Sequence, residues 1–305
     1  MQVKILGSAA GGGFPQWNCA CPNCHAVRGG QFRGKARSQT QVAVSSDGKS
    51  WFLLGASPDL RYQIESSPEL PPRSGTRNSP IEGVVLASAD LDHTLGLLLL
   101  RELQPFQVWA AESVIQILRG ENSMFRMLNR AADQVHWSTI RAGVRFTLKS
   151  VIGNDSGIGC MPIAVSSCYP AYANRVPKSD EAVVGLILTA PSGETMGFFP
   201  QLALLTPELK SLFAKLDCLL LDGTFWSDDE LIRLQRSGQR AREMGHIPVG
   251  GEDGTLNQLK ELSTPRKMYI HINNTNPMLN EASAEYRAVH DAGWELAEDR
   301  CHFTL

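Results

Sequence analysis

Two carboxylates and an imidazole lie within four residues of this chain, at Asp90, Asp92 and His93. The apolar residues 83–87 precede them and the leucine-rich residues 93–103 follow, which predicts a buried strand, a polar turn and a helix. Ligands of α/β proteins bind at such turns, beyond the carboxyl end of a strand. A plain helix N-cap by Asp90 or Asp92 is the alternative interpretation. The segment is therefore a candidate metal site.

Two later apolar segments also end in groups that bind metals. Residues 217–221 predict a strand that ends at Asp222, and Gly223 after it allows close backbone approach. Residues 267–272 predict another strand, which carries His271. Between the two lies a Met-Gly-His segment with His246. Three predicted strand ends thus each supply an Asp or a His, which together could hold a divalent metal ion.

The first thirty residues contain a donor set of another kind. Cys19, Cys21 and Cys24 place three thiols within six positions, and this spacing lets three thiolates face one tetrahedral zinc ion. Loose thiols or a disulfide are the alternatives, but the chain has 7 cysteines, an odd number for a disulfide framework. A closed structural zinc site needs a fourth ligand, for which His25 and His302 are candidates.

The composition is that of a globular enzyme. The 305 residues, 43% of them hydrophobic, can form a large core in a single domain over residues 1–305. The net charge of −2 argues against nucleic-acid binding, and no apolar stretch reaches the ~18 residues of a membrane helix. The chain starts with a predicted strand and shows no signal peptide, so we expect a cytoplasmic protein. We expect the four dispersed cysteines to be small buried hydrophobic residues: Cys160, Cys168, Cys218 and Cys301.

Short strands alternate with helices along the chain. This pattern predicts an α/β protein with two mixed sheets packed face to face and helices outside, the αββα sandwich. The polar and aromatic residues 168–181 form a loop long enough to be functional, although surface packing of Tyr169 and Tyr172 explains it equally well. The predicted strands cover residues 2–6, 40–45, 50–55, 83–88, 159–166, 183–189, 195–199, 217–221 and 267–272. The predicted helices cover residues 93–103, 111–119, 206–215, 227–243, 254–262 and 280–291.

The segment around His93 resembles the metal motif of the metallo-β-lactamase superfamily, which reads H-x-H-x-D-H at the end of a strand. Asp92 and His93 match the Asp-His pair of that motif. Ser88 and Asp90 stand where its two leading histidines should be. The resemblance implies an αββα fold with a metal site at this strand end.

The order of the later motifs is similar to the tRNA-processing and phosphodiesterase branches of the superfamily. By this resemblance Asp222 is a metal ligand, His271 is a late metal ligand, and His246 is a catalytic residue. An imidazole titrates near neutral pH and suits proton transfer, so His246 would act as a proton donor or as an orienting group. In related phosphodiesterases a residue three positions after the late histidine completes the cysteine site, which corresponds to Asn274 here.

Over its whole length the chain also resembles a family of proteins that take part in the biosynthesis of the redox cofactor pyrroloquinoline quinone (PQQ). The resemblance implies a cytoplasmic step that makes PQQ from a Glu-Tyr unit of a precursor peptide. Two roles attach to the family: an iron-dependent oxygenase that hydroxylates the tyrosine ring, and a carrier that moves PQQ or its precursor to the periplasm. The implied partners are the peptide-derived precursor, O2 and other PQQ biosynthesis proteins, with no nucleic acid or membrane, and a homodimer is left open.

Metal chemistry favours the oxygenase. Dinuclear zinc hydrolases of the superfamily hold their ions with several imidazoles, and this chain lacks the leading histidines. What remains around one ion is Asp92, His93, His271 and Asp222, with Asp90 as a further candidate. Two imidazoles and a carboxylate with open positions are the ligand set of non-haem Fe(II) oxygenases. We therefore expect a structural Zn²⁺ and an active-site Fe²⁺, which Zn²⁺, Mn²⁺ or Cu²⁺ can replace in vitro; a zinc-dependent hydrolase is a second alternative.

Overall fold

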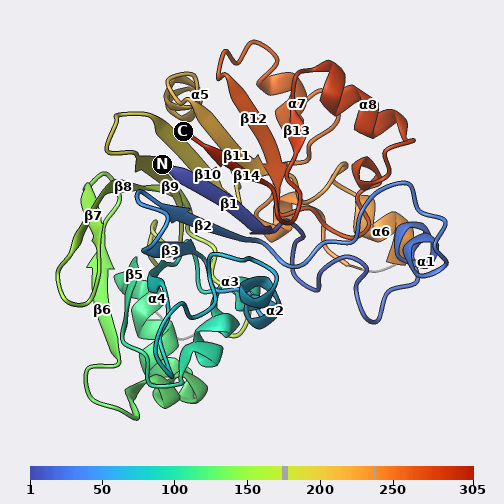
Figure 1. Ribbon diagram of the computed structural model, residues 1–305. Helices are drawn as coiled ribbons and strands as arrows, with labels where there is room; N and C mark the ends of the chain where they lie inside the picture. The colour runs from blue at the N-terminus through green and yellow to red at the C-terminus, as the bar shows by residue number, and fades with distance from the viewer. Residues whose placement is uncertain (174–177, 236–237) are drawn as a thin grey trace. The chain divides into compact units, whose positions relative to one another are not determined.

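The computed structural model describes residues 1–173, 178–235 and 238–305. The chain shown in Figure 1 divides into two compact units. The first consists of residues 1–6, 41–195 and 300–305, and the second of residues 7–40 and 196–299. That residues 1–305 act as a single domain stays a prediction.

The first unit contains a mixed sheet and a group of antiparallel strands. Its strands are β1 (Gln2–Gly7), β2 (Gln41–Ser45), β3 (Trp51–Leu54), β4 (Ile81–Val85), β5 (Phe106–Ala111), β6 (Val135–Ile140), β7 (Phe146–Lys149), β8 (Asp155–Ser166), β9 (Val183–Thr189) and β14 (His302–Thr304). The mixed sheet has the order β14-β1-β2-β3-β4-β5-β6. Within it β3, β4, β5 and β6 run parallel, and β2 pairs antiparallel with β3. β8 pairs antiparallel with both β7 and β9.

The sequence pattern does not predict β5, β6 or β7. β5 is an apolar segment that is buried at five of its six residues, so it lacks the alternation that identifies a strand. Periodicity alone cannot separate such a segment from a buried helix. Pairing with β4 and β6 makes this segment a strand, because the inter-strand hydrogen bonds satisfy backbone groups that would otherwise be buried without partners.

Short helices cover this sheet, and their apolar side chains form one buried cluster with those of the strands. They are α2 (Leu60–Glu65), α3 (Leu91–Thr94), the 3₁₀ helix η1 (Leu95–Leu100), α4 (Glu112–Gln116), the π-helical turn η2 (Ile117–Glu121) and the 3₁₀ helix η3 (Ser123–Asn129). Leu60, Leu97, Val114, Leu118 and Phe125 from these helices pack in the same cluster as side chains of β3, β4 and β5. The predicted helix over residues 111–119 is present as α4 and η2.

The predicted continuous helix over residues 93–103 is wrong. α3 is a single turn, and η1 continues it only to Leu100. An α-helix would direct the Gly96 N–H to the carbonyl of Asp92. It donates instead to the Ala56 carbonyl at 2.8 Å, while the His93 carbonyl accepts the Ala56 N–H at 2.7 Å. These tertiary hydrogen bonds replace helical ones and fix the backbone on which His93 sits.

The second unit is built on four parallel strands (yellow to red in Figure 1). They are, in spatial order, β10 (Thr195–Phe199), β11 (Cys218–Asp222), β12 (Arg266–Ile270) and β13 (Glu295–Leu296). The helices are α1 (Pro22–Arg28), α5 (Pro207–Phe213), α6 (Glu230–Gln235), η4 (Arg242–Met244), α7 (Thr255–Gln258), η5 (Pro277–Leu279) and α8 (Ala284–Asp291). Among the described residues, no helix has the length and apolar character needed to cross a membrane.

All four predicted helices of this unit are longer in the sequence pattern than in the structure, and the one over residues 206–215 is present as α5. The pattern over residues 227–243 is realised only as α6 and η4, with residues 236–237 outside the described part. Gly238 has a φ of +129°, a backbone conformation that does not belong to a helix. α7 and α8 are likewise shorter than residues 254–262 and 280–291, and Ser283 begins α8 by accepting the Tyr286 N–H.

Glu230 fastens the start of α6 to a segment distant in the sequence. Its carboxylate accepts the Trp226 N–H at 2.7 Å and the hydroxyl of Thr275, which follows β12. Burial is the main cause that raises the pKa of Glu230, to about 7, against the opposing effect of these hydrogen bonds. The contact between α6 and Thr275 therefore depends on the protonation state of the Glu230 carboxyl group.

We expect Gly96→Ala to destabilise the protein by about 1–3 kcal/mol, as other overpacked substitutions do. A Cβ at this position would lie 2.3 Å from the Ser57 carbonyl oxygen and 2.7 Å from the Ala56 carbonyl carbon, both backbone atoms that cannot rotate away. Thermal unfolding followed by circular dichroism measures the loss. Gly120→Ala is the matched control, since nothing lies within 4 Å of its Cβ position; equal melting temperatures for the two variants would contradict the prediction.

We expect the stabilisation from Glu230 to fall as the pH rises. Its pKa in the folded state, about 7, lies above the ordinary value of 4.5, so the folded chain holds a proton that the unfolded chain has lost. The contribution is full below pH 4.5 and is lost as the pH rises through 7, by an amount on the order of 3 kcal/mol. Urea unfolding at about pH 5 and about pH 8 should show wild type losing stability relative to Glu230→Gln. A difference between the two proteins that does not vary with pH would refute this.

Candidate metal centre

The segment Ser88–His93 follows β4 in the first unit, and its acids do not act as simple helix caps. Asp90 occupies the N-cap position of α3, yet its side chain makes no capping hydrogen bond. Its carboxylate accepts the Ser88 hydroxyl at 2.8 Å instead. Asp92 Oδ2 lies 4.0 Å from His93 Nε2, and His93 is buried. The N-cap interpretation therefore does not account for these carboxylates.

Tyr172 holds the neighbouring loop to this segment. Its hydroxyl donates to the Ala89 carbonyl, and burial together with the charge of Asp90 raises the pKa of Tyr172 to about 12. Tyr169 packs against the apolar cluster of the unit. Of the predicted loop over residues 168–181, residues 174–177 lie outside the described part.

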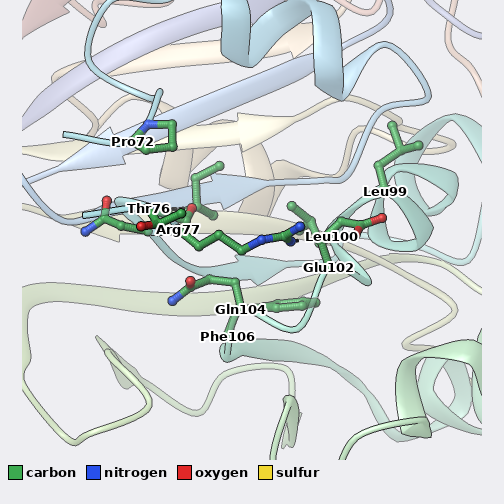
Figure 2. Close-up of a pocket in the computed structure, with 11 residues that line it drawn as sticks. Pro72, Thr76, Arg77, Leu99, Leu100, Glu102, Gln104 and Phe106 are labelled. Atoms are coloured by element: carbon green, nitrogen blue, oxygen red, sulfur yellow. Dashed lines mark hydrogen bonds and ion pairs between the residues drawn. The ribbon is translucent and has the colours of Figure 1, made fainter. Parts of the chain in front are cut away.

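A separate pocket of about 260 Å³ lies at the opposite edge of the same sheet. Ile81 and Phe106, the first residues of the parallel strands β4 and β5, line it, whereas the Ser88–His93 segment follows the carboxyl end of β4. Arg77 extends across the pocket towards Glu102, 3.9 Å away (Figure 2). Both charged side chains are mainly exposed, so this ion pair is weak. The pocket adds no catalytic group to the site.

In the second unit, parallel pairing brings Asp222 and His271 to one edge of the sheet. β11 and β12 pair so that Asp222 faces Ile270, and His271 follows directly. Gly223 permits this approach, because a Cβ there would lie 2.8 Å from Tyr269 Cβ. His271 has a φ of +59°, a left-handed conformation that non-glycine residues rarely adopt and that concentrates at functional sites.

Asp222 is fully buried and accepts four hydrogen bonds. Oδ2 accepts the Leu202 N–H at 2.9 Å and His246 Nδ1 lies 2.8 Å from it. Oδ1 accepts the Thr224 N–H at 3.0 Å and the Thr224 hydroxyl at 2.6 Å. These contacts use the acceptor sites that a carboxylate offers. Direct coordination of a metal by Asp222, which stays a prediction, would have to displace one of these donors.

Asp222, His246 and His271 each offer one ligand atom, and these atoms lie within 4.8 Å of one another. The two imidazole rings stack with centroids 5.6 Å apart and an interplanar angle of 18°. All three residues are buried. Gly245 sets the position of His246 with a φ of +82°, which turns the chain after η4. Two imidazoles beside a carboxylate are groups that could hold a divalent metal ion.

The three cysteines of the second unit also converge. Cys19, Cys21 and Cys24 place their sulfur atoms within 4.8 Å of one another, compared with about 3.8 Å for thiolates around a tetrahedral zinc ion. Asn274 Nδ2 lies within hydrogen-bond distance of all three sulfurs, at 3.1, 3.6 and 3.3 Å. Rotating the amide by half a turn would present its oxygen instead, so Asn274 fits the fourth position. His25 is exposed in α1.

The electrostatics of the cysteine cluster call for a cation. Burial and the charge of Cys24 together raise the pKa of Cys21 to about 12. Three thiolates at neutral pH therefore need a positive charge between them. The cluster fits a structural zinc ion on this ground.

The other cysteines have different surroundings. Cys160 and Cys218 are fully buried, as expected of small hydrophobic residues, and Cys301 is half-buried. The expectation is wrong for Cys168, which is exposed. It lies outside any strand, after β8 ends at Ser166, so no sheet packing covers it.

Sequence reasoning missed Thr224. Its hydroxyl lies 2.6 Å from Asp222 and 2.8 Å from His271 Nδ1, between two predicted site residues. The available signal was the Asp-Gly-Thr order, since an Asp side chain commonly accepts the N–H two residues on.

We expect Cys21→Ser to lower the zinc content and the melting temperature together, because metal binding is coupled to folding. Cys168→Ser is the control, since that thiol is exposed and lies outside the cluster. Elemental analysis and thermal unfolding of both variants give the measurement. Zinc content in Cys21→Ser equal to that of wild type would reduce the cluster to three thiols without a structural role.

Comparison with known proteins identifies the family. The model of the β-lactamase superfamily domain matches residues 50–272. Coenzyme PQQ synthesis protein B of Acinetobacter baumannii (strain ACICU) is 38% identical over 100% of both chains. The protein of the same name from Nitrosococcus oceani is 40% identical over 98% of both chains.

A solved structure agrees with these relatives. The crystal structure of Zn²⁺-bound PqqB from Methylobacterium extorquens matches with a TM-score of 0.91 and 39% identity, over 100% of both chains. The predicted metallo-β-lactamase fold, with two mixed sheets flanked by helices, is thereby confirmed. The chain belongs to the metallo-β-lactamase superfamily and, within it, to the family of coenzyme PQQ synthesis protein B.

Proposed function

We propose that this protein acts in PQQ biosynthesis as an iron-dependent oxygenase that hydroxylates the tyrosine ring of a Glu-Tyr-derived precursor. Its membership in the family of coenzyme PQQ synthesis protein B supports the pathway. The observation that carries the chemistry is the depleted imidazole set. Ser88 and Asp90 replace two histidines of the superfamily motif, while Asp92 and His93 are kept.

We assign the iron to Asp92, His93 and His271, on the order of the motifs along the chain. Two imidazoles and a carboxylate leave coordination positions open for O2 and substrate, unlike a closed zinc site. Bound iron would supply the activation of O2. Asp222 and Asp90 are further ligand candidates, although Asp222 already accepts four hydrogen bonds.

The reaction needs a proton-handling group and a reductant. One oxygen atom of O2 enters a ring C–H bond as a hydroxyl group, and the other leaves as water with two electrons and two protons from the reductant. His246 Nδ1 is held 2.8 Å from Asp222 Oδ2, so Nε2 is the atom at which this imidazole can accept a proton and pass it on. The burial of His246 keeps that transfer away from bulk water. We place the step in the cytoplasm, where thiols stay reduced.

The test combines metal analysis with an activity assay. Anaerobically prepared protein should contain one Fe²⁺ besides the cysteine-bound zinc. With O2, a reductant and a Glu-Tyr peptide it should form a product one oxygen atom heavier, detected by mass spectrometry. His93→Ala should lose both iron and activity, and His246→Gln should slow turnover more than it weakens metal binding. His136→Gln, in β6, is the control and should match wild type.

Two outcomes would count against the oxygenase, and a third against the role assigned to His246. Two tightly held zinc ions with phosphodiester cleavage would favour the hydrolase. Absence of product in wild type, with His93→Ala still binding PQQ as wild type does, would favour the carrier. Equal loss of turnover in His136→Gln and His246→Gln would remove the assigned role of His246.

A further inference from the structure

We infer that Thr224 is a positioning residue, which holds the proton of His271 on Nδ1 and thereby keeps the lone pair of that ring on Nε2. Through Thr224, the buried carboxylate of Asp222 orients His271 in addition to His246, which it contacts directly. The inference starts from the contacts of a single hydroxyl group.

The Thr224 hydroxyl has three polar neighbours but only one proton to donate. Oγ1 lies 2.6 Å from Asp222 Oδ1, 2.8 Å from His271 Nδ1 and 2.9 Å from the His271 carbonyl oxygen. The carboxylate is the strongest acceptor of the three and makes the shortest contact, so the proton is donated to Asp222. Oγ1 is then an acceptor towards Nδ1. His271 must accordingly donate from Nδ1.

The opposite arrangement is unfavourable at both ends. If the Thr224 hydroxyl donated to Nδ1, Asp222 would lose one of its four donors while buried. A buried charged acceptor that loses a donor carries a large desolvation cost. The His271 proton would also move to Nε2, and a nitrogen that carries the proton has no lone pair with which to bind a metal. Geometry and charge thus select one tautomer.

The same carboxylate holds the second imidazole directly. His246 Nδ1 lies 2.8 Å from Asp222 Oδ2, so this ring also has its proton on Nδ1. The two rings are nearly parallel, with an interplanar angle of 18°. The Asp222 carboxylate contacts His246 directly and His271 through the Thr224 hydroxyl. His271 therefore needs no change of tautomer when a metal binds at its Nε2, and His246 keeps its Nε2 lone pair available to accept a proton.

The backbone around Thr224 leaves its hydroxyl little freedom. Thr224 is 3% exposed, and its N–H is held by Asp222 Oδ1 at 3.0 Å. The Asn276 amide donates to the carbonyls of Gly223 and Thr224, at 3.0 and 3.3 Å. A β-branched side chain on this fixed backbone has few χ1 choices. A serine would keep the hydroxyl but gain rotamer freedom.

The tautomer can be tested without metal or substrate. ¹⁵N NMR of the imidazole nitrogens in metal-free protein should place the His271 proton on Nδ1 in wild type and Thr224→Ser. In Thr224→Val, which has nearly the same shape without a hydroxyl, a substantial share of the proton should move to Nε2. Thr224→Ala gives the same comparison if the valine variant does not fold. Thr264→Val is the matched control, because it removes another buried threonine hydroxyl, bonded to the Phe213 carbonyl at 2.6 Å.

Metal affinity gives the second readout, with cobalt(II) alone as the probe. This part rests on the proposed coordination by His271. Thr224→Val should bind cobalt(II) about 10–100-fold more weakly than wild type, as expected for loss of a group that orients a ligand, whereas Thr224→Ser should retain most of the affinity. An unchanged tautomer in Thr224→Val, or a changed tautomer with unchanged cobalt affinity, would overturn the inference. Failure of the wild type to hydroxylate would instead count against the oxygenase and would leave the tautomer result standing.

Discussion

The buried carboxylate of Asp222 is the constraint on which the second unit depends. A charged group removed from water is costly unless hydrogen bonds satisfy it. Four donors surround it, from the loop after β10, from its own turn and from the loop after η4. The convergence of these loops is therefore required by one charge. It also brings His246 and His271 together, because each is held by that carboxylate directly or through Thr224.

The first unit holds its site residues by a different means. There the backbone of α3 and η1 is fixed by reciprocal hydrogen bonds with Ala56, at the His93 carbonyl and at the Gly96 N–H. Gly96 makes the contact possible because its lack of a Cβ allows the two backbones to touch. Side-chain hydrogen bonds play the smaller part: Ser88 donates to Asp90, and Tyr172 donates to the Ala89 carbonyl. The two units thus rely on side-chain and on backbone contacts, respectively.

One short segment of the second unit serves both of its donor sets. His271 contacts Thr224, and Asn274 contacts the three cysteine sulfurs. Thr275 is bonded to Glu230, and Asn276 holds the turn that carries Asp222 and Thr224. A metal ion among the cysteines would therefore stiffen the backbone next to His271. A structural zinc ion could therefore affect the position of the His271 imidazole without contacting it.

The sequence alone determined where the reactive groups are delivered. Apolar segments that end at Asp222, at His271 and before His93 predicted strand ends. Such predictions are possible because hydrophobic runs and turn residues are local signals, contained within a few positions of the chain. The cysteine spacing predicted the cluster in the same way. The interruption of the helix after His93, the strand β5 and the hydroxyl of Thr224 between two site residues were decided by the tertiary structure. In each case the deciding partner is distant in sequence, and a hydrogen bond across such a distance leaves no periodic trace in the chain.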